Sequence, residues 1–269
     1  MRPSIASPDA VRALDVGRHG PPDAAADLVA VEAPLHVRLN GEPFAVIMRT
    51  PGADGPLAVG FLHAEGLVRG IDDVVRLDEP MPDVINVVFA RGRSDAVAAA
   101  LASRRLVAAA SSCGVCGRRD LHGLDGLAPV EDHWQVAAAV VDGMPAALRR
   151  AQSAFAQTGG LHAAGLFALD GRLEDAAEDI GRHNTVDKLV GEAVQQAALP
   201  LGRRMLLVSG RTSFEIVQKA WRAGVPLIAA VSAPSSMAVD VAARAGITLL
   251  GFVRDGRFNV YTHRDRVAL

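Results

Sequence analysis

Both cysteines of the chain lie in one short segment. Cys113 and Cys116 are separated by two residues, and a glycine follows each of them. Glycine permits a tight turn and leaves room around a sulfur atom, and the thiolate is the reactive form of cysteine. This spacing favours dithiol redox chemistry, zinc ligation or carriage of sulfur as a persulfide. The alternative is a pair of buried cysteines that only pack against their neighbours.

Zinc ligation has one further observation in its favour. His63-Ala64-Glu65, taken with the later Cys-x-x-Cys, is similar to the H-x-E…P-C-x-x-C signature of zinc deaminases. However, Ser112 stands where that signature has proline, and the gap between its two halves is long. Catalytic zinc is therefore the weaker interpretation, and we assign no metal ligands.

A dense group of ionisable residues runs from Glu178 to Lys188 and includes His183. It falls on one turn and on the first turn of a predicted helix, which Asn184 or Thr185 can cap. Ordinary ion pairs at a solvated helix start are the alternative. Because so many titratable groups converge in one place, we favour a functional surface, with His183 and Lys188 as candidate groups.

Two turns that each join a predicted strand to a predicted helix are rich in hydroxyl groups. The first contains Ser209, Gly210, Arg211 and Ser213, and the second contains Ser235. Free amides at a helix start bind anions, and successive parallel strands end at the same sheet edge, where ligands bind in α/β proteins. Simple capping of each helix is the alternative. Neither turn carries a Walker or dinucleotide-binding fingerprint.

Near the C-terminus, Phe252-Val253-Arg254-Asp255-Gly256-Arg257 places two arginines on either side of a predicted turn. Arginine pairs can bind phosphate through bidentate hydrogen bonds. Taken alone, a charged hairpin is the better interpretation of this segment.

The overall composition limits the class of protein. The 269 residues are 50% hydrophobic and 22% charged, which predicts a well-packed core, and the net charge of −2 gives no support for nucleic-acid binding. No apolar run reaches the roughly 18 residues of a transmembrane helix. We find no secretory signal peptide, so a reducing cytoplasm is the expected location, without membrane association.

Four parts are predicted: a flexible leader over 1–27, an N-terminal α+β portion over 28–110, a cysteine loop over 111–126 and a C-terminal α/β domain over 127–269. Strand and helix alternate after residue 204, which predicts parallel pairing. Strands are expected over 35–39, 44–48, 84–89, 106–110, 161–169, 173–177, 205–209, 226–231, 248–252 and 258–261. Helices are expected over 57–65, 95–103, 145–157, 184–198, 213–223 and 237–245.

Long motifs in this chain resemble those of the FdhD family, the sulfur carriers needed to activate formate dehydrogenase. The match runs from about Val31 to Thr262. The motifs that carry it are Ser-Ser-Cys-Gly-Val-Cys-Gly at 111–117, Thr-Gly-Gly-Leu-His-Ala-Ala at 158–164, Glu-Asp-Ile-Gly-Arg-His-Asn-x-Val-Asp-Lys at 178–188, Val-Ser-Gly-Arg-x-Ser-Phe-Glu at 208–215, Ser-Ala-Pro-Ser-Ser at 232–236 and Gly-Phe-x-Arg-x-Gly-Arg-Phe-Asn at 251–259.

The resemblance implies a sulfurtransferase that takes sulfur from a cysteine desulfurase as a persulfide. It would pass the sulfur to molybdenum or tungsten in the bis(molybdopterin guanine dinucleotide) cofactor before that cofactor enters formate dehydrogenase. By position, Cys113 resembles the persulfide-bearing cysteine and Cys116 its partner. Residues 252–257 resemble the cofactor-binding segment. Family members are homodimers, and their C-terminal region is similar to the cytidine deaminase fold.

A pocket for phosphates is consistent with the residues themselves and with the family resemblance. The helix starts at Ser213 and Ser235, together with Arg211, Arg254 and Arg257, suit the diphosphates of a guanine nucleotide cofactor. His183 and Lys188 would bias the charge near the metal. A binding chaperone that delivers the cofactor without transferring sulfur is the alternative function, followed by a zinc deaminase-like enzyme.

Overall fold

The computed structural model describes residues 8–14, 27–103, 126–130 and 134–268. The predicted strand over 106–110 and the predicted cysteine loop, apart from Gly126, lie outside the described residues. The described part combines a four-stranded sheet, a six-stranded sheet and two small strand pairs with seven α-helices. This mixed α/β architecture agrees with the predicted fold class, while the likeness to the cytidine deaminase fold stays a prediction.

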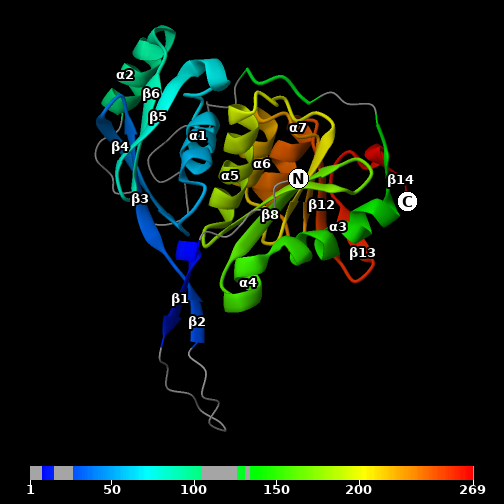
Figure 1. The fold of residues 1–269 in the computed structure, drawn as a ribbon. Coiled ribbons are helices and arrows are strands. Elements are labelled where there is room, and N and C mark those ends of the chain that lie inside the picture. The colour runs from blue at the N-terminus through cyan, green and yellow to red at the C-terminus, as the bar shows by residue number, and fades with distance from the viewer. Residues whose placement is uncertain (1–7, 15–26, 104–125, 131–133, 269) are drawn as a thin grey trace.

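The N-terminal elements form the smaller of the two main parts of the molecule (Figure 1). They are η1 (Pro8–Ala10), β1 (Val11–Leu14), β2 (Asp27–Ala30), β3 (Ala33–Leu39), β4 (Glu42–Arg49), α1 (Asp54–Ala64), η2 (Ile71–Asp73), β5 (Val74–Met81), β6 (Val84–Phe89), η3 (Arg91–Arg93) and α2 (Ser94–Ser103). The four-stranded sheet has the order β4-β3-β6-β5. Alternate residues of β3, namely Leu35, Val37 and Leu39, are fully buried, as the period of a half-buried strand requires.

A hairpin turn at Asn40-Gly41 joins β3 to β4. Both residues have positive φ angles, 50° and 93°, which asparagine and glycine tolerate best. The Asn40 side chain accepts a hydrogen bond from the Phe89 amide at 2.9 Å, and the Gly41 amide donates to Asn86 Oδ1 at 2.7 Å. Both partners lie on β6, so the turn is fixed to the neighbouring strand.

The expectation that order begins near Leu28 is wrong for residues 8–14. Val11–Leu14 forms β1, which pairs with β2 in antiparallel register. The sequence of this stretch shows no regular alternation, and none of the residues of β1 is fully buried. The pairing with β2 therefore decides the conformation here, and a local pattern could not reveal it.

The C-terminal elements form the larger part. They are β7 (Val136–Ala137), α3 (Ala138–Ala151), α4 (Ser153–Thr158), β8 (His162–Ala168), β9 (Leu173–Asp179), α5 (Arg182–Gln195), β10 (Arg204–Val208), α6 (Phe214–Arg222), β11 (Leu227–Ala230), α7 (Ser236–Arg244), β12 (Thr248–Arg254), β13 (Arg257–Val260), η5 (Arg264–Arg266) and β14 (Val267–Ala268). The six-stranded sheet has the order β13-β12-β11-β10-β8-β9. The predicted parallel pairing holds for β10, β11 and β12, and the outer strands β8, β9 and β13 pair antiparallel.

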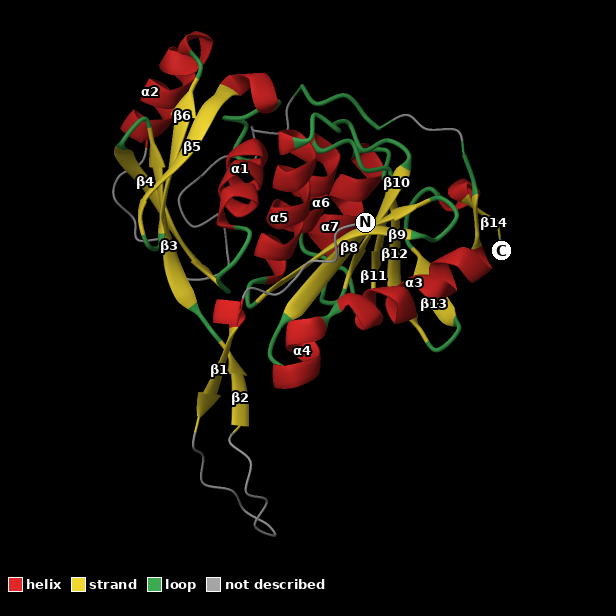
Figure 2. Cartoon of the chain, viewed as in Figure 1, coloured by secondary structure: helices red, strands yellow, loops and turns green. Residues whose placement is uncertain are grey.

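Helices cover both faces of the six-stranded sheet (Figure 2). α5, α6 and α7 lie on one face and share a core with α1, through residues such as Leu57, Leu189 and Ile216. α3 covers the other face, where Met144 and Leu148 pack against the opposite sides of the same strands. None of the helices in the described ranges is long and apolar enough to span a bilayer.

The helix predicted over 145–157 is wrong in both its start and its continuity. α3 begins at Ala138 and contains Pro145 in its interior, and α4 follows after Gln152, which has a non-helical ψ of 74°. Val141, Met144 and Leu148 lie on one buried face of α3. We infer that burial of this face outweighs the backbone hydrogen bond that a proline removes.

α1 and α5 cross in unusually close contact. A Cβ atom on Gly60 would overlap the carbonyl oxygen of Asp187, and one on Gly191 would overlap the carbonyl oxygen of Pro56. Each helix thus contributes one glycine whose bare Cα lets the other backbone approach. The crossing joins the N-terminal portion to the six-stranded sheet, since α5 also packs on β8 and β9.

Candidate functional site

The two hydroxyl-rich turns lie side by side, as their place after parallel strands predicts. The Thr212 amide donates to the Ala233 carbonyl at 3.2 Å, and the Ser235 amide donates to the Thr212 carbonyl at 3.0 Å. The ends of β10 and β11 and the starts of α6 and α7 therefore form one continuous edge. This edge is the place where ligands bind in open α/β sheets.

The two serines at these helix starts have different partners. Ser235 Oγ accepts a hydrogen bond from the Ala238 amide at 3.2 Å, so this hydroxyl caps α7. Ser213 makes no side-chain cap for α6. Its hydroxyl instead contacts His183 Nε2 at 3.0 Å and Glu215 Oε2 at 3.2 Å. The capping alternative thus describes Ser235, whereas Ser213 belongs to a group of interacting side chains.

His183 joins α5 to this edge. Its Nε2 atom lies 2.8 Å from Glu215 Oε2, and both side chains are almost fully enclosed. Burial raises the pKa of Glu215, but hydrogen bonds from His183 and Ser213 and the nearby charge of Lys219 outweigh it, so the pKa lies below its ordinary value. Glu215 is thus an anion at neutral pH. Sequence reasoning did not single it out, because an acidic residue in the first turn of a helix is ordinary.

Lys188 makes its contacts with residues other than His183 and the two hydroxyl-rich turns. Its ammonium group is buried against Asp179, with 2.7 Å between Nζ and Oδ2, and it donates to the carbonyl oxygens of Thr50 and Glu178 at 3.1 Å. Asp179 also accepts from the amides of Thr50 and Gly181 and from Asn184 Nδ2. This part of the ionisable motif therefore fastens the loop after β4 to the end of β9.

Replacement of Lys188 by methionine should lower the free energy of unfolding by about 3–5 kcal/mol, because it leaves the buried Asp179 carboxylate without a cation. The matched control is Arg76→Met, which removes the exposed ion pair of Arg76 with Asp78 and should cost less than about 1 kcal/mol. Urea denaturation measures both values. Equal values for the two variants would contradict the structural role of Lys188.

The predicted phosphate-binding segment over 252–257 ends β12 and begins β13. Phe252 adopts a positive φ of 57°, and its amide donates to the Ser232 carbonyl at 3.2 Å, which places it beside the β11–α7 turn. Val253 is fully buried in the core under α3. Its backbone alone is available to a ligand. Arg254, Asp255, Gly256 and Arg257 are exposed, and the predicted turn at Asp255-Gly256 is confirmed.

Cys113 and Cys116 lie outside the described residues, so their place relative to this edge stays a prediction. The same holds for the two cysteines of the zinc-deaminase-like signature. His63, the histidine of that signature, is buried in α1, and its Nδ1 atom donates to the Val68 carbonyl at 2.8 Å. Burial, followed by the charges of Arg222 and Lys219, lowers the pKa of His63, although hydrogen bonding to backbone carbonyls opposes the shift.

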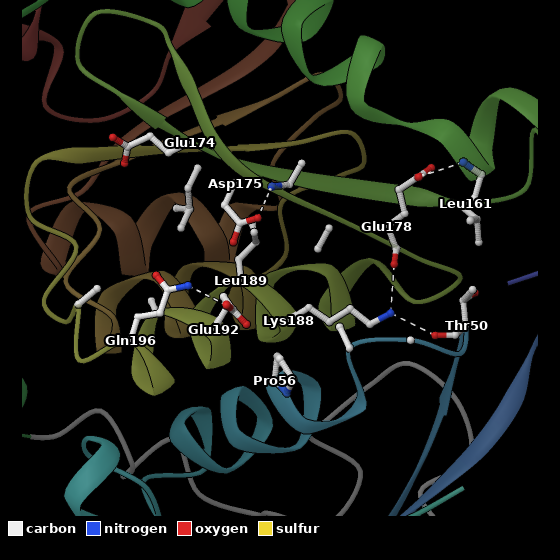
Figure 3. A pocket seen from close by; sticks show the side chains of 18 of the residues that line it. Thr50, Pro56, Leu161, Glu174, Asp175, Glu178, Lys188, Leu189, Glu192 and Gln196 are labelled. Atoms are coloured by element: carbon white, nitrogen blue, oxygen red, sulfur yellow. Dashed lines mark hydrogen bonds between the residues drawn. The ribbon is translucent and has the colours of Figure 1, made fainter. Parts of the chain in front are cut away.

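A cavity of about 520 Å³ opens between β9, α5 and the loop that follows β4 (Figure 3). Asp175 from β9 and Glu192 from α5 approach each other across it. Burial raises the pKa of Asp175, and the charge of Glu192 adds to the effect. Glu174 is paired with Arg204 at 2.8 Å, and Glu178 accepts from the amides of Ala154 and Phe155. The sequence did not predict this cavity, because the loop after β4 that lines it is distant in the chain from β9 and α5.

Comparison with known proteins places the chain in a family. The sequence profile of the FdhD/NarQ family matches residues 30–268. The chain is 47% identical to the sulfur carrier protein FdhD of Streptomyces coelicolor, covering 94% of this chain and 93% of that protein. It is 44% identical to the protein of the same name from Anaeromyxobacter dehalogenans, covering 100% of this chain and 98% of that protein.

A solved structure supports the fold. It comes from Desulfotalea psychrophila and is described as that of a candidate formate dehydrogenase accessory protein. The two structures agree with a TM-score of 0.73 and 24% sequence identity, over 90% of this chain and 92% of the other. Since the profile matches nearly the whole chain and relatives at 44–47% identity span almost their full length, this protein belongs to the FdhD/NarQ family.

Proposed function

We propose that this protein carries sulfur for the activation of formate dehydrogenase. The observation that supports the proposal most is the match, over nearly the whole chain, to relatives named sulfur carrier protein FdhD. Sulfur carriage requires a thiol, and Cys113 and Cys116 form a Cys-x-x-Cys segment between small residues. A thiolate with room for one more sulfur atom is suited to hold a persulfide.

In the proposed reaction, the Cys113 thiolate attacks the outer sulfur of a persulfide on a cysteine desulfurase. A new S–S bond forms at Cys113, the donor's S–S bond breaks, and the desulfurase cysteine leaves as a thiolate. Sulfur and electrons therefore balance in this step. In the second step the Cys116 thiolate attacks Cys113 Sγ, the persulfide S–S bond breaks, and a Cys113–Cys116 disulfide forms. The outer sulfur leaves as sulfide and binds molybdenum or tungsten in its bis(molybdopterin guanine dinucleotide) cofactor, which is the substrate here, and a cellular thiol then reduces the disulfide.

The edge formed by the ends of β10 and β11 and the starts of α6 and α7 is suited to hold that substrate. The start of α6 and the exposed Arg254 and Arg257 present amides and guanidinium groups to phosphates. Phe252 lies beside the β11–α7 turn, so the 252–257 segment joins the same edge. We extend the proposal, on the family resemblance, to a homodimer that works in the cytoplasm with a cysteine desulfurase and formate dehydrogenase as partners.

The proposal is tested in cells that lack their own sulfur carrier of this family. Expression of this chain should restore formate dehydrogenase activity, which is assayed as formate-dependent reduction of a dye. A chain that accumulates in soluble form but leaves the activity at background would contradict the proposal.

A further inference from the structure

We propose that two buried residues, Lys219 and Asp187, are positioning residues for His183 in the proposed transfer of sulfur. They act through Glu215, which holds one nitrogen of the His183 ring, so that the other nitrogen, Nδ1, is left for the substrate. The inference rests on the proposed function for the identity of that substrate. The arrangement of the side chains is argued from distances, burial and charge.

The four side chains form two stacked ion pairs between α5 and α6. His183 and Asp187 are one helical turn apart on α5. Glu215 and Lys219 are likewise one turn apart on α6, and residues at this spacing are neighbours on a helix face. His183 Nε2 lies 2.8 Å from Glu215 Oε2, and one turn further on Lys219 Nζ lies 2.6 Å from Asp187 Oδ1. The second pair therefore lies directly behind the first.

Glu215 fixes the proton on one ring nitrogen of His183. The Glu215 carboxylate is charged at neutral pH, and a charged carboxylate can only accept hydrogen bonds. Its short contact with His183 Nε2 therefore requires a proton on Nε2. The Ser213 hydroxyl donates to the same carboxylate oxygen at 3.2 Å. Any proton that the His183 ring gains or loses is consequently the one on Nδ1.

Lys219 helps to keep Glu215 charged in the protein interior. Burial raises the pKa of Glu215. Hydrogen bonds from His183 and Ser213 and the nearby charge of Lys219 outweigh burial, so the pKa lies below its ordinary value. Asp187, whose side chain is only 4% exposed, holds the Lys219 ammonium group in place. Burial raises the pKa of Asp187, and Lys219 opposes that shift as well. One ammonium group thus serves two enclosed carboxylates.

The remaining nitrogen of His183 lacks a partner within the described part of the chain. Nδ1 is enclosed and forms no hydrogen bond there, and the residue is only 5% exposed. Buried polar atoms are nearly always hydrogen-bonded in folded proteins. His183 contacts Ser213 at 3.0 Å, and Ser213 belongs to the edge that we propose to hold the substrate. A substrate atom is therefore the partner that suits Nδ1.

The chemistry of the proposed reaction supplies such an atom. In its second step the outer sulfur leaves Cys113 as sulfide, which is an anion. A charged His183 ring would donate the Nδ1 proton to this sulfur in a charge-assisted hydrogen bond. Lys219 and Asp187 would not touch the substrate themselves. They would keep Nε2 engaged with Glu215, and Nδ1 would remain the only ring nitrogen that the substrate can use.

Other ionisable groups also face this cluster. The charge of His183 acts on His162 of β8, and the charge of Glu65, which follows α1, acts on Asp187. Both groups are the same in every variant compared below. A difference between those variants therefore reports on Lys219.

Nitrogen NMR of the full-length chain with isotope-labelled histidine tests the arrangement. At alkaline pH the neutral His183 ring should carry its proton on Nε2, and the second proton should appear on Nδ1 as the pH falls. Lys219→Met should raise the midpoint of this titration by at least about half a pH unit, because it removes a positive charge beside the His183–Glu215 pair. Lys219→Arg, which keeps the charge, should restore the midpoint.

The matched control is Arg204→Met. It removes a different ion pair, in which Arg204 Nε lies 2.8 Å from Glu174 Oε2. This variant should leave the His183 titration where it is in the unmodified chain. A merely structural role of Lys219 would lower the stability of the Lys219→Met variant without moving the titration.

The pH dependence of formate dehydrogenase activation gives a second readout. The sulfur-loaded chain is added to an extract of cells that lack their own carrier, and the initial rate of activation is followed against pH. Because a charged His183 would donate the Nδ1 proton, the rate should fall as the pH rises through the ring titration. Lys219→Met should move this fall to higher pH by about the same amount as the NMR midpoint, and Arg204→Met should not move it.

The outcomes separate this inference from the proposed function. A neutral His183 ring with its proton on Nδ1 would overturn the inference, and this measurement on the unmodified chain does not depend on the folding of any variant. A titration or activation profile that Lys219→Met and Arg204→Met change equally would also overturn it. If the NMR results are as expected and the unmodified chain does not activate formate dehydrogenase, the arrangement stands and the proposed function falls.

Discussion

Replacement of Cys113 by alanine should reduce formate dehydrogenase activity in complemented cells to the level of cells without the gene. Alanine cannot hold a persulfide, and Cys116 is the only other thiol in the chain. In the proposed reaction Cys116 assists transfer and does not hold the persulfide, so the variant has no sulfur acceptor. The measurement is the formate-dependent activity of extracts, normalised to the amount of soluble variant.

Two controls give this result its meaning. GDP binding by the Cys113→Ala variant should equal that of the unmodified chain, because the residues proposed to bind phosphate, among them Arg254 and Arg257, are distant from Cys113 in the sequence. Ser112→Ala, a change of similar size at the preceding residue, should retain activity. Full activity in the Cys113→Ala variant would instead favour a chaperone that delivers the cofactor without carrying sulfur.

Gly60→Ala or Gly191→Ala should destabilise the protein by at least about 3 kcal/mol, enough to lower soluble yield sharply. The added methyl group would overlap a backbone carbonyl oxygen of the facing helix in each case, that of Asp187 or that of Pro56. Because the backbone cannot rotate out of the way as a side chain can, α1 and α5 must separate. The measurement is the midpoint of urea denaturation.

The matched control is Gly143→Ala, in the interior of α3. A Cβ at Gly143 meets no atom within 4 Å. Alanine is favoured over glycine inside a helix, so this variant should be more stable than the unmodified chain by about 0.5–1 kcal/mol. If all three variants shifted the midpoint in the same direction, the close crossing of α1 and α5 would not be a determinant of stability.

The regular half of the fold could be predicted from the sequence. The strands that became β10, β11 and β12 are short apolar runs separated by amphipathic helices, and this pattern permits few arrangements. The proximity of Thr212 and Ala233 followed from it. The helix around Pro145 does not begin at this proline, although a local rule places proline at a helix start, because Met144 and Leu148 lie on one buried face of a longer helix.

The candidate site could be predicted only in part, because its partners are distant in the chain. The motif over 178–188 correctly marked a dense polar cluster, but one sequence does not reveal that Thr50 would contact both Lys188 and Asp179. The motif therefore has two parts. Lys188 and Asp179 form a structural ion pair, and His183 contacts Ser213. The lining of the 520 Å³ cavity was missed for the same reason.

The central claim is that one sulfur atom travels on Cys113, and mass spectrometry tests it most directly. The purified chain is mixed with a cysteine desulfurase, pyridoxal phosphate and cysteine, and thiols are alkylated before digestion. The account predicts a mass gain of one sulfur atom on the peptide that contains Cys113, and loss of that gain when Cys113 is replaced by alanine. An unmodified peptide in the presence of an active desulfurase would contradict the account.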